Sequence, residues 1–374
     1  MFSEDTITAL RKSVESGTAA HGPVSVQVLP SGICNAECVF CPIHSRTIPL
    51  ELKQKHAPRL VSQGGLLDFQ LYREFIDDLK ELGLTKRIQY TGLGDPLVHP
   101  KFVEMVSYAR AQLPNCSLIV VTNGIYLKKY CRELVDSAVD EISVSLNAGK
   151  PKTWTELNRK GTEEQFHAII EALEYLGRIK NSGKPRLTIT AVLSKHNYDD
   201  LRDLLTIAQR SKSAALTFIR MMVIDLGGVQ SNRDLLCSPA QFRKFDQTLE
   251  ELKSNASGVY VGLCGIGPDD GSLDTAGVAA TAPCYAGWTF ALLYPDGSIY
   301  PCCMCETSLG NVAKARFKDI WRSTLYSSFR TRVMRIPQLG VMPGCLCNEC
   351  GYYYENQEYH RLLSLQRKPG DVYS

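Results

Sequence analysis

The sequence predicts an α/β fold in which six strand–helix units are followed by a small cysteine-rich region. Three observations support this prediction. Apolar runs that suit buried strands recur along the chain, helical patterns separate them, and seven of the fourteen cysteines lie after residue 283. Because neighbouring parallel strands need a crossover connection, usually a helix, the alternation predicts a parallel sheet with right-handed crossovers.

The predicted strands lie, in order, at residues 24–29, 87–91, 117–122, 140–146, 186–193 and 215–222. The predicted helices lie at about 68–82, 100–112, 126–137, 162–180, 198–211 and 239–253. The first of these helices is the clearest, because its leucines and phenylalanine recur at helical spacing.

The alternation stops near residue 255, and residues 258–282 are predicted to form a linker or an irregular segment. We therefore expect an N-terminal extension (1–23), a strand–helix domain (24–255) and a cysteine-rich C-terminal domain with its tail (256–374).

Composition narrows the class of protein. The net charge is only +3, which does not indicate a nucleic-acid-binding surface. The chain has no apolar run of about 18 residues or more, so no membrane span is expected. The first residues lack the basic and apolar regions of a signal peptide, which favours a cytoplasmic location. In a reducing compartment, clustered cysteines more often bind metal or react than form disulfides.

The most informative motif is a C-x3-C-x2-C spacing formed by Cys34, Cys38 and Cys41. Iron–sulfur clusters are normally held by four protein ligands, so a [4Fe–4S] cluster bound here would keep one iron open to a small molecule. A zinc site is the alternative, but zinc usually takes four ligands in paired sets, and no partner pair lies near.

This motif resembles the signature of the radical S-adenosylmethionine (SAM) superfamily. Phe40 stands where the family places an aromatic residue near the adenine, and the motif follows the first predicted strand. The resemblance implies a partial (β/α)6 barrel with its chemistry at the carboxyl ends of the strands. It also implies that SAM binds the open iron and is cleaved by one electron to a 5'-deoxyadenosyl radical, which abstracts hydrogen from the substrate.

The resemblance extends to candidate SAM contacts. Gly94 and Asp95 follow the second predicted strand, where the family has a Gly-Gly-Glu-Pro-like motif that contacts the SAM amino group. Ser145 and Asn147, at the end of the fourth strand, are candidate ribose or carboxylate contacts, and Arg159 is a candidate for the methionine carboxylate. For each residue the alternative is a turn or capping role.

A second set of cysteines lies near the C-terminus. Cys284 and Cys302 flank an Asp-Gly hairpin signal, and Cys347 and Cys350 form a C-x2-C pair, so the four make a suitable thiolate shell. The pattern resembles the twitch domain, a short form of the SPASM domain, which holds an auxiliary [4Fe–4S] cluster. The full SPASM pattern needs a further cysteine where this chain has Asn356, so one auxiliary cluster is expected. A structural zinc ribbon is the alternative.

Seven other cysteines have no predicted ligand role, and two of them, Cys116 and Cys131, are isolated and are expected to be small buried residues. Cys303, Cys305 and Cys345 lie near the C-terminal set, and the sequence leaves open whether any of them is a ligand. Cys237 and Cys264 are isolated, and each is either a small buried residue or a hydrogen-atom donor.

The resemblance implies a radical SAM enzyme that oxidises a small polar substrate, such as a sugar or cyclitol, with help from the auxiliary cluster. It also implies an external electron donor such as flavodoxin or ferredoxin. About twenty residues precede the first strand, which is short for a peptide-binding domain and favours a small molecule. A radical epimerase and a maturase of a ribosomally made peptide are the alternatives, and a non-enzymatic iron–sulfur redox sensor is a remote one.

Overall fold

The computed structural model describes residues 3–56, 65–223, 232–275, 280–347 and 350–364. Its described part contains a single sheet in the order β10-β9-β8-β1-β2-β3-β4-β5-β6-β7. The strands are β1 Ser25–Val28, β2 Arg87–Tyr90, β3 Ser117–Thr122, β4 Glu141–Ser145, β5 Arg186–Val192, β6 Ala215–Ile219, β7 Tyr260–Cys264, β8 Phe290–Leu293, β9 Ser298–Tyr300 and β10 Gly310–Asn311. The first seven strands pair in parallel, and β8 pairs in parallel with β1.

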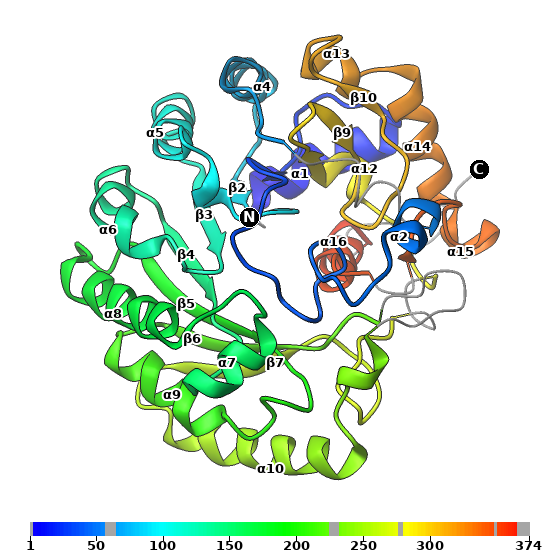
Figure 1. Ribbon diagram of the computed structural model, residues 1–374. Helices are drawn as coiled ribbons and strands as arrows, with labels where there is room; N and C mark the ends of the chain where they lie inside the picture. Colours follow the sequence, from blue (N-terminus) through cyan, green and yellow to red (C-terminus); the bar gives the residue numbers. More distant parts are fainter. Residues whose placement is uncertain (1–2, 57–64, 224–231, 276–279, 348–349, 365–374) are drawn as a thin grey trace.

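Helices cover the outer face of the curved sheet (Figure 1). Those of the barrel are α4 Phe69–Leu82, α5 Phe102–Gln112, α6 Leu127–Asp136, α8 Glu163–Ile179, α9 Leu201–Arg210 and α10 Pro239–Asn255. The others are α1 Glu4–Ser16, α2 Leu50–His56, α7 Pro151–Leu157, α12 Ala286–Thr289, α13 Phe317–Trp321, α14 Thr324–Met334, α15 Ile336–Leu339 and α16 Tyr353–Ser364, with short 3-10 turns at Pro96–Val98 and Arg233–Leu235.

The six predicted strands and six predicted barrel helices are confirmed, and so is the α/β class with a partial parallel barrel. The prediction of an irregular segment at 258–282 was wrong over β7, which pairs with β6 and continues the sheet past residue 255. Its sequence, Tyr-Val-Gly-Leu-Cys, is short and contains a glycine, so periodicity alone did not mark it as a strand.

The C-terminal region joins the same sheet. A tight turn at Gly297, with φ of 83°, connects the antiparallel strands β8 and β9, which confirms the predicted hairpin. β8 lies beside β1 along its whole length, with Val28 level with Leu293. The amino end of β1 therefore lies beside the chain that follows Cys284, and its carboxyl end leads into the loop with Cys34.

The two faces of the barrel strands differ in polarity. Outward residues such as Ile88 and Tyr90 pack under helices, and the Tyr90 hydroxyl lies 2.7 Å from that of Tyr72 on α4. Because side chains alternate along a strand, the intervening residues face the interior. On β1, β2, β4 and β5 these inward residues are mainly polar, whereas on β3 and β8 they are mainly apolar. The polar ones are Ser25, Gln27, Arg87, Gln89, Ser117, Glu141, Ser143, Ser145, Arg186, Thr188, Thr190 and Thr217, and the apolar ones include Ile119, Val121, Val192, Ala215, Ile219, Phe290 and Leu292. The interior is therefore more polar than the apolar packed core of a closed (β/α)8 barrel.

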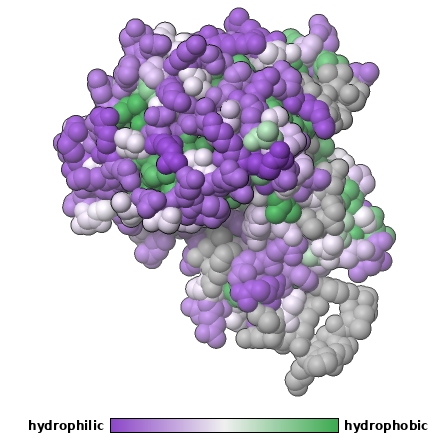
Figure 2. Space-filling view, turned by 90° about the horizontal axis from the view of Figure 1, so that it is seen from below, coloured by the Kyte–Doolittle hydropathy of each residue, from purple (hydrophilic) through white to green (hydrophobic). Residues whose placement is uncertain are grey.

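The surface seen in Figure 2 is mainly hydrophilic, with small scattered hydrophobic areas. Among the described residues, none of the helices combines the length and apolar character that a bilayer crossing requires.

Candidate active site and auxiliary cysteine cluster

A cavity of about 360 Å³ lies at the carboxyl ends of β1 to β5. Its walls contain most of the residues predicted to bind the cluster and SAM. These residues are Cys34, Cys38, Phe40, Cys41, Gly94, Asp95, Ser145 and Asn147. Segments up to about 110 residues apart in the sequence thus meet at the edge where the chemistry of such barrels is located.

Backbone and side-chain donors surround the thiols of residues 34–41, which we call the cysteine loop. The amide of Ala36 and the side chain of Asn123 approach the Cys34 sulfur, at 3.5 and 3.6 Å. The amide of His44 lies 3.3 Å from the Cys41 sulfur. Such donors stabilise thiolates and cluster sulfur atoms, so their arrangement fits an iron–sulfur cluster.

Burial opposes thiolate formation in the cysteine loop unless a cation is present. Burial, with smaller contributions from Asp95 and Cys41, raises the pKa of Cys34 to about 11. It also raises the pKa of Cys38, where both neighbouring thiols add to the effect. A bound iron centre reverses this balance, because a metal cation favours the deprotonated ligand.

The cysteine loop is anchored to the chain around α7. The amide of Val39 donates to the Leu157 carbonyl at 2.9 Å, and the amide of Glu37 donates to the Asn158 side chain at 2.8 Å. Lys53 is 5% exposed, and its ammonium group donates to the carbonyl groups of Ile43 at 2.8 Å and Ser45 at 2.7 Å, in the turn that directly follows the cysteine loop. These contacts fix the direction of the loop before any cofactor binds.

Gly94 allows the loop after β2 to dock on the cysteine loop. A Cβ atom at this position would lie 2.0 Å from the carbonyl oxygen of Ile33. The amide of Gly94 donates to the Ser31 carbonyl and that of Asp95 to the Ile33 carbonyl, both at 3.0 Å. The glycine is therefore needed for a close approach of two backbones, in addition to its predicted place beside SAM.

The Asp95 carboxylate ties the ends of β2 and β3 together. One oxygen accepts hydrogen bonds from the Thr122 hydroxyl at 2.8 Å and the Asn123 amide at 2.7 Å, and the other accepts from the Leu97 amide at 2.9 Å. Burial raises the pKa of Asp95, although these hydrogen bonds oppose the rise. The carboxylate already has three donors within the protein, and its predicted contact with the SAM amino group stays a prediction.

Ser145 and Asn147 line the cavity at the end of β4. Asn147 has φ of 64°, a left-handed conformation that asparagine tolerates well, and its side-chain oxygen accepts from the Val192 amide at 3.0 Å. The Ser145 hydroxyl lies 3.3 Å from that of Thr190. Arg159, by contrast, is exposed and does not line the cavity, so its predicted role has no support in this geometry.

His44 also lines the cavity and was not singled out from the sequence. Its Nε2 lies 2.8 Å from the Leu93 carbonyl, which can only accept, so this nitrogen carries the proton. Burial lowers the pKa of His44, and the ring is therefore neutral at pH 7. The signal available in the sequence was its position three residues after Cys41, which by itself is also common for a turn residue.

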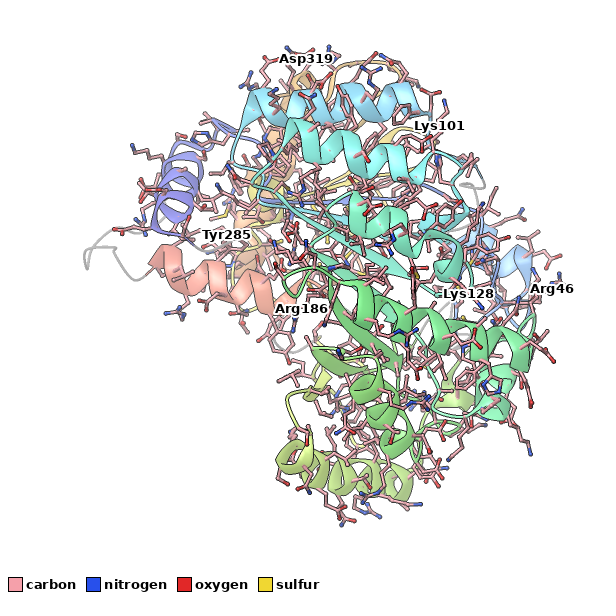
Figure 3. The ribbon with its side chains drawn as sticks, turned by 90° about the vertical axis from the view of Figure 1, so that its left-hand side faces the viewer. Arg46, Lys101, Lys128, Arg186, Tyr285 and Asp319 are labelled. Carbon is pink, nitrogen blue, oxygen red and sulfur yellow. The ribbon has the colours of Figure 1, made fainter. Side chains whose placement is uncertain are left out.

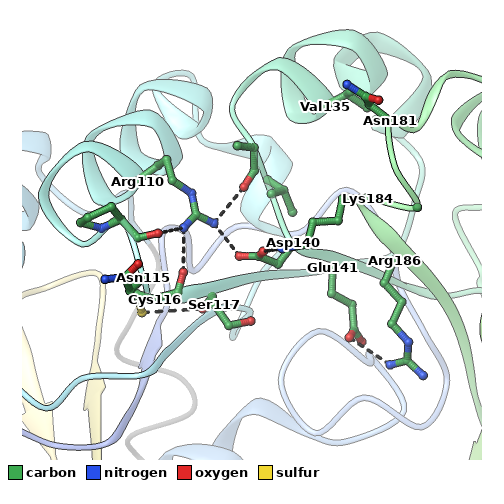
Figure 4. A pocket seen from close by; sticks show the side chains of 14 residues that line it. Arg110, Asn115, Cys116, Ser117, Val135, Asp140, Glu141, Asn181, Lys184 and Arg186 are labelled. Atoms are coloured by element: carbon green, nitrogen blue, oxygen red, sulfur yellow. Dashed lines mark hydrogen bonds and ion pairs between the residues drawn. The ribbon is translucent and has the colours of Figure 1, made fainter.

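A larger cavity of about 1020 Å³ lies at the opposite, amino ends of β3 to β5. Figure 4 shows that its charged groups pair with one another. Asp140 binds Arg110 and Lys184, and Glu141 binds Arg186 at 3.1 Å. Because these charges are already neutralised, this cavity is a weaker candidate for a charged ligand than the site near the cysteine loop.

The four C-terminal thiols predicted as ligands form one electrostatically coupled group. Burial raises the pKa of Cys284, Cys347 and Cys350, and a hydrogen bond with Cys303 raises that of Cys302. Each of the four thiols also interacts electrostatically with the other three. Among the described residues, no group of three or more His, Cys, Asp and Glu side chains is arranged to hold a single metal ion.

Three separate segments carry these thiols. The amide of Cys284 donates to the Val333 carbonyl on α14 at 3.1 Å. The Thr275 hydroxyl donates to the Cys347 carbonyl at 3.1 Å and accepts from the Cys350 amide at 2.9 Å, so it closes the C-x2-C pair. Cys302 follows β9, which returns the chain to the amino end of β1.

Cys305 and Cys345 lie opposite each other across a short antiparallel bridge. A thiol–thiol hydrogen bond with Cys305 is the largest cause of the raised pKa of Cys345. Both thiols also interact electrostatically with Cys302. Their contact places them beside the predicted ligand set, and whether either is a ligand stays open.

Asn356 fixes the chain next to Cys284. Its side chain accepts from the Tyr285 amide at 2.7 Å and donates to the Pro283 carbonyl at 2.9 Å. His360, four residues further along α16, lies 3.0 Å from the Tyr285 hydroxyl. Figure 3 shows Tyr285 on the side of α1 and α16, far from Arg46 near the cysteine loop.

The two isolated cysteines differ in accessibility. Cys237 is 4% exposed and belongs to the main hydrophobic core, as expected for a small buried residue. Cys264 is exposed at the carboxyl end of β7. Since Leu263 packs against the core, alternation places Cys264 on the inner face of the barrel.

Comparison with known families agrees with this architecture. The chain matches the radical SAM superfamily over residues 28–208 and SPASM, an iron–sulfur cluster-binding domain, over residues 284–351. The fold and the cysteine loop thus define a radical SAM enzyme. The chain contains a radical SAM domain and a C-terminal SPASM domain. The predicted cofactors, a [4Fe–4S] cluster, SAM and an auxiliary iron–sulfur cluster, follow from these two domains.

Relatives in this superfamily have diverse activities. An AdoMet-dependent heme synthase of Oleidesulfovibrio alaskensis is 24% identical over 86% of this chain and 79% of that protein. A GTP 3',8-cyclase of Nautilia profundicola is 26% identical over 53% of this chain, and the match spans about half of that protein, 56%.

Solved structures share the fold. SuiB of Streptococcus suis bound to S-adenosylmethionine gives a TM-score of 0.63 at 15% identity, covering 90% of this chain and 76% of that one. The anSMEcpe structure with bound AdoMet gives 0.57 at 15% identity, covering 91% of this chain and 98% of that one. At such low identity, this likeness concerns the fold alone.

Proposed function

We propose that this radical SAM enzyme oxidises a small, neutral, polar substrate, such as a sugar or cyclitol, inside the barrel. The observation that carries the proposal is the polar inner face of the strands, directly below the cavity beside the cysteine loop. When bound, the two clusters and SAM supply hydrogen abstraction and one-electron acceptance. The chain supplies the thiolates, the binding groups and the exclusion of water.

The inner face suits hydroxyl groups better than a charged group. Its uncharged polar side chains include Gln27, Gln89, Ser143, Thr188 and Thr217, whose amides and hydroxyls both donate and accept hydrogen bonds. The apolar Ile119, Val121 and Leu292 lie beside them in the strand register. None of these side chains carries a charge. A polyol can therefore be bound from several sides without an unpaired ionic group in the site.

The charged inward residues lie lower in the barrel and already have partners. Arg87 donates to the Ser25 hydroxyl at 2.9 Å and forms an ion pair with Glu355 on α16. Arg186 pairs with Glu141. A strongly anionic substrate would have to displace a carboxylate from one of these arginines, which costs free energy.

The oxidation can be written with a balance of atoms and electrons. A carbinol carbon of the substrate gives its hydrogen atom to the 5'-deoxyadenosyl radical. This transfer yields 5'-deoxyadenosine and a substrate radical. The hydroxyl then loses a proton and the substrate loses one electron, so that a carbonyl group forms. The auxiliary cluster is the proposed electron acceptor, and Cys284, Cys302, Cys347 and Cys350 are its proposed ligands.

The names of the relatives make a peptide the main alternative to a small-molecule substrate. The heme synthase and the GTP cyclase are named for small molecules. One SuiB structure is described as bound to the precursor peptide SuiA. The inner face of this chain favours the small molecule, because its polar side chains suit a compact polyol.

A substrate survey tests this proposal. The reconstituted enzyme is incubated anaerobically with SAM, reductant and either a panel of sugars and cyclitols or a panel of peptides. We expect 5'-deoxyadenosine above background and a product two hydrogens lighter only with members of the first panel. Gln89→Leu should raise KM, whereas Gln112→Leu, at the end of outer helix α5, should not. Turnover confined to peptides would reject the proposal.

A radical epimerase is the second candidate, and the position of Cys264 favours it. This thiol is exposed on the inner face of β7, whereas the cavity beside the cysteine loop lies along β1 to β5. An epimerase needs a hydrogen donor on the face of the substrate opposite the abstracting radical. In deuterated water its product would gain one deuteron at carbon, whereas the ketone of a dehydrogenase would not.

A further inference from the structure

A buried arginine without an ion-pair partner among the described residues lies on α14, one turn before Val333, whose carbonyl accepts from the Cys284 amide. Arg330 on α14 is 1% exposed. Its Nε donates to the Gly287 carbonyl at 2.8 Å and its Nη2 to the Trp321 carbonyl at 2.9 Å. Its Nη1 is buried and has no hydrogen-bond partner among the described residues. None of the ion pairs in the described part of the chain includes it.

Three aromatic rings surround this guanidinium. Its central carbon lies 4.7 Å from the ring centre of Trp321, 4.9 Å from that of Tyr326 and 5.9 Å from that of Trp288. Burial lowers the pKa of Arg330 to about 10, so the group remains a cation at neutral pH. Aromatic faces attract a cation but do not neutralise it, and a buried charge without a counter-ion is costly.

A second buried donor lies in the same place. Tyr326 is 0% exposed, and its hydroxyl has no hydrogen-bond partner among the described residues. Burial raises the pKa of Tyr326, Arg330 opposes the rise, and the thiols of Cys305 and Cys302 add to it. The ring that contacts Arg330 thus also carries a hydroxyl that interacts electrostatically with these two thiols.

The backbone around Cys284 connects these groups. The Cys284 amide donates to the Val333 carbonyl, one turn after Arg330 on α14. A Cβ atom at Gly287 would lie 2.8 Å from Cγ of Arg330, so this glycine makes room for the arginine three residues after Cys284. A cation and an unpaired hydroxyl donor therefore lie on the helix whose backbone holds Cys284, one of the thiols expected to bind an anionic cluster.

We propose that Arg330 and Tyr326 are positioning residues that raise the reduction potential of the auxiliary cluster. This inference rests on the auxiliary-cluster part of the proposed function. A cluster held by four thiolates is an anion, and reduction adds one more negative charge. A buried cation and a hydrogen bond to sulfur both stabilise the reduced state more than the oxidised state. The cluster in turn supplies the counter-charge that Arg330 lacks.

The test is a potentiometric titration followed by electron paramagnetic resonance. It uses the full chain with all three cysteines of the cysteine loop replaced by Ala, so that only the auxiliary cluster gives a signal, and the holoenzyme is measured in parallel. At a fixed potential, Arg330→Met should lower the ratio of reduced to oxidised cluster about tenfold, a shift of about 59 mV. Arg330→Lys keeps the charge and should change the ratio less than about threefold.

Two controls separate this effect from a purely structural one. Arg335→Met removes an exposed arginine next to the end of the same helix and should leave the ratio unchanged. Tyr326→Phe keeps the ring and removes only the hydroxyl, and should lower the ratio about threefold with full iron content. If Arg330→Met does not fold, the titration of Tyr326→Phe serves as the test of the inference.

The inference is wrong if Arg330→Met retains its iron and titrates like the parent, or if Arg330→Lys shifts as far as Arg330→Met. An unchanged ratio in Tyr326→Phe would equally reject the part assigned to its hydroxyl. Loss of all iron from the background chain is a different result, because it would reject the proposed auxiliary site itself.

Discussion

Replacing Gly94 by Ala tests how closely the loop after β2 must approach the cysteine loop. The new Cβ would start 2.0 Å from the Ile33 carbonyl oxygen, whereas ordinary contacts of this kind are above about 3 Å. The two backbones must separate by about 1 Å, which would break the hydrogen bonds from the amides of Gly94 and Asp95. Two lost hydrogen bonds at about 1 kcal/mol each, plus about 1 to 3 kcal/mol of overpacking, give about 3 to 5 kcal/mol.

The assay combines a urea denaturation curve with iron content and SAM binding. Because Ile33 directly precedes Cys34, we expect Gly94→Ala to lose stability and to bind less of the open-iron cluster. Gly65→Ala is the matched control, since a Cβ there meets nothing within 4 Å. The reasoning is refuted if Gly94→Ala shows the denaturation midpoint, iron content and SAM affinity of the parent chain.

Three further predictions follow from the same geometry. Replacing all three cysteines of the cysteine loop by Ala should remove about four iron atoms per chain and all SAM cleavage, and iron analysis should still find the auxiliary cluster; zinc in its place would indicate a structural ribbon. If the enzyme is a dehydrogenase, Cys264→Ala retains turnover, whereas loss of solvent deuterium from the product of that variant would identify an epimerase. Burial acts to raise the pKa of Asp140, but hydrogen bonds from Lys184, the Leu118 amide and Arg110 outweigh it and hold the pKa below its usual value of 3.8. Its stabilising effect is present above that value and lost as pH falls through the lower folded pKa, so Asp140→Asn should lower the urea midpoint at pH 7 and should lower it progressively less as the pH falls below 3.8.

Much of the barrel was predictable because its signals are local. Buried parallel strands are short apolar runs, and their helices carry one apolar face, so both are visible without any tertiary information. The cysteine loop was predictable because a three-thiolate spacing restricts the chemistry strongly. β7 was missed because a five-residue strand with one glycine has no clear period, and only its pairing with β6 identifies it.

Sequence patterns are less informative where a residue has two possible roles. Asp95 and Asn147 were expected as ligand contacts, and both also make hydrogen bonds that join neighbouring strands. No local pattern reveals such a partner, because Thr122 and Val192 are distant in the sequence. Arg159 fitted a family motif, yet it lies exposed outside the cavity. Arg330 could not be found at all, since its significance depends on its having no ion pair with any carboxylate in the described part of the chain.

The pairing of β8 with β1 has a consequence for any attempt to divide the protein. β1 lies between β2 and β8, so a chain cut before β8 would leave one side of β1 without its hydrogen-bonded neighbour. Such an edge is prone to pair with another molecule and aggregate. Further anchors would be lost with it, including the ion pair of Arg316 with Asp78, a carboxylate that is almost fully buried. The strand–helix region should therefore be produced together with its C-terminal region, and truncation cannot be used to isolate the first cluster.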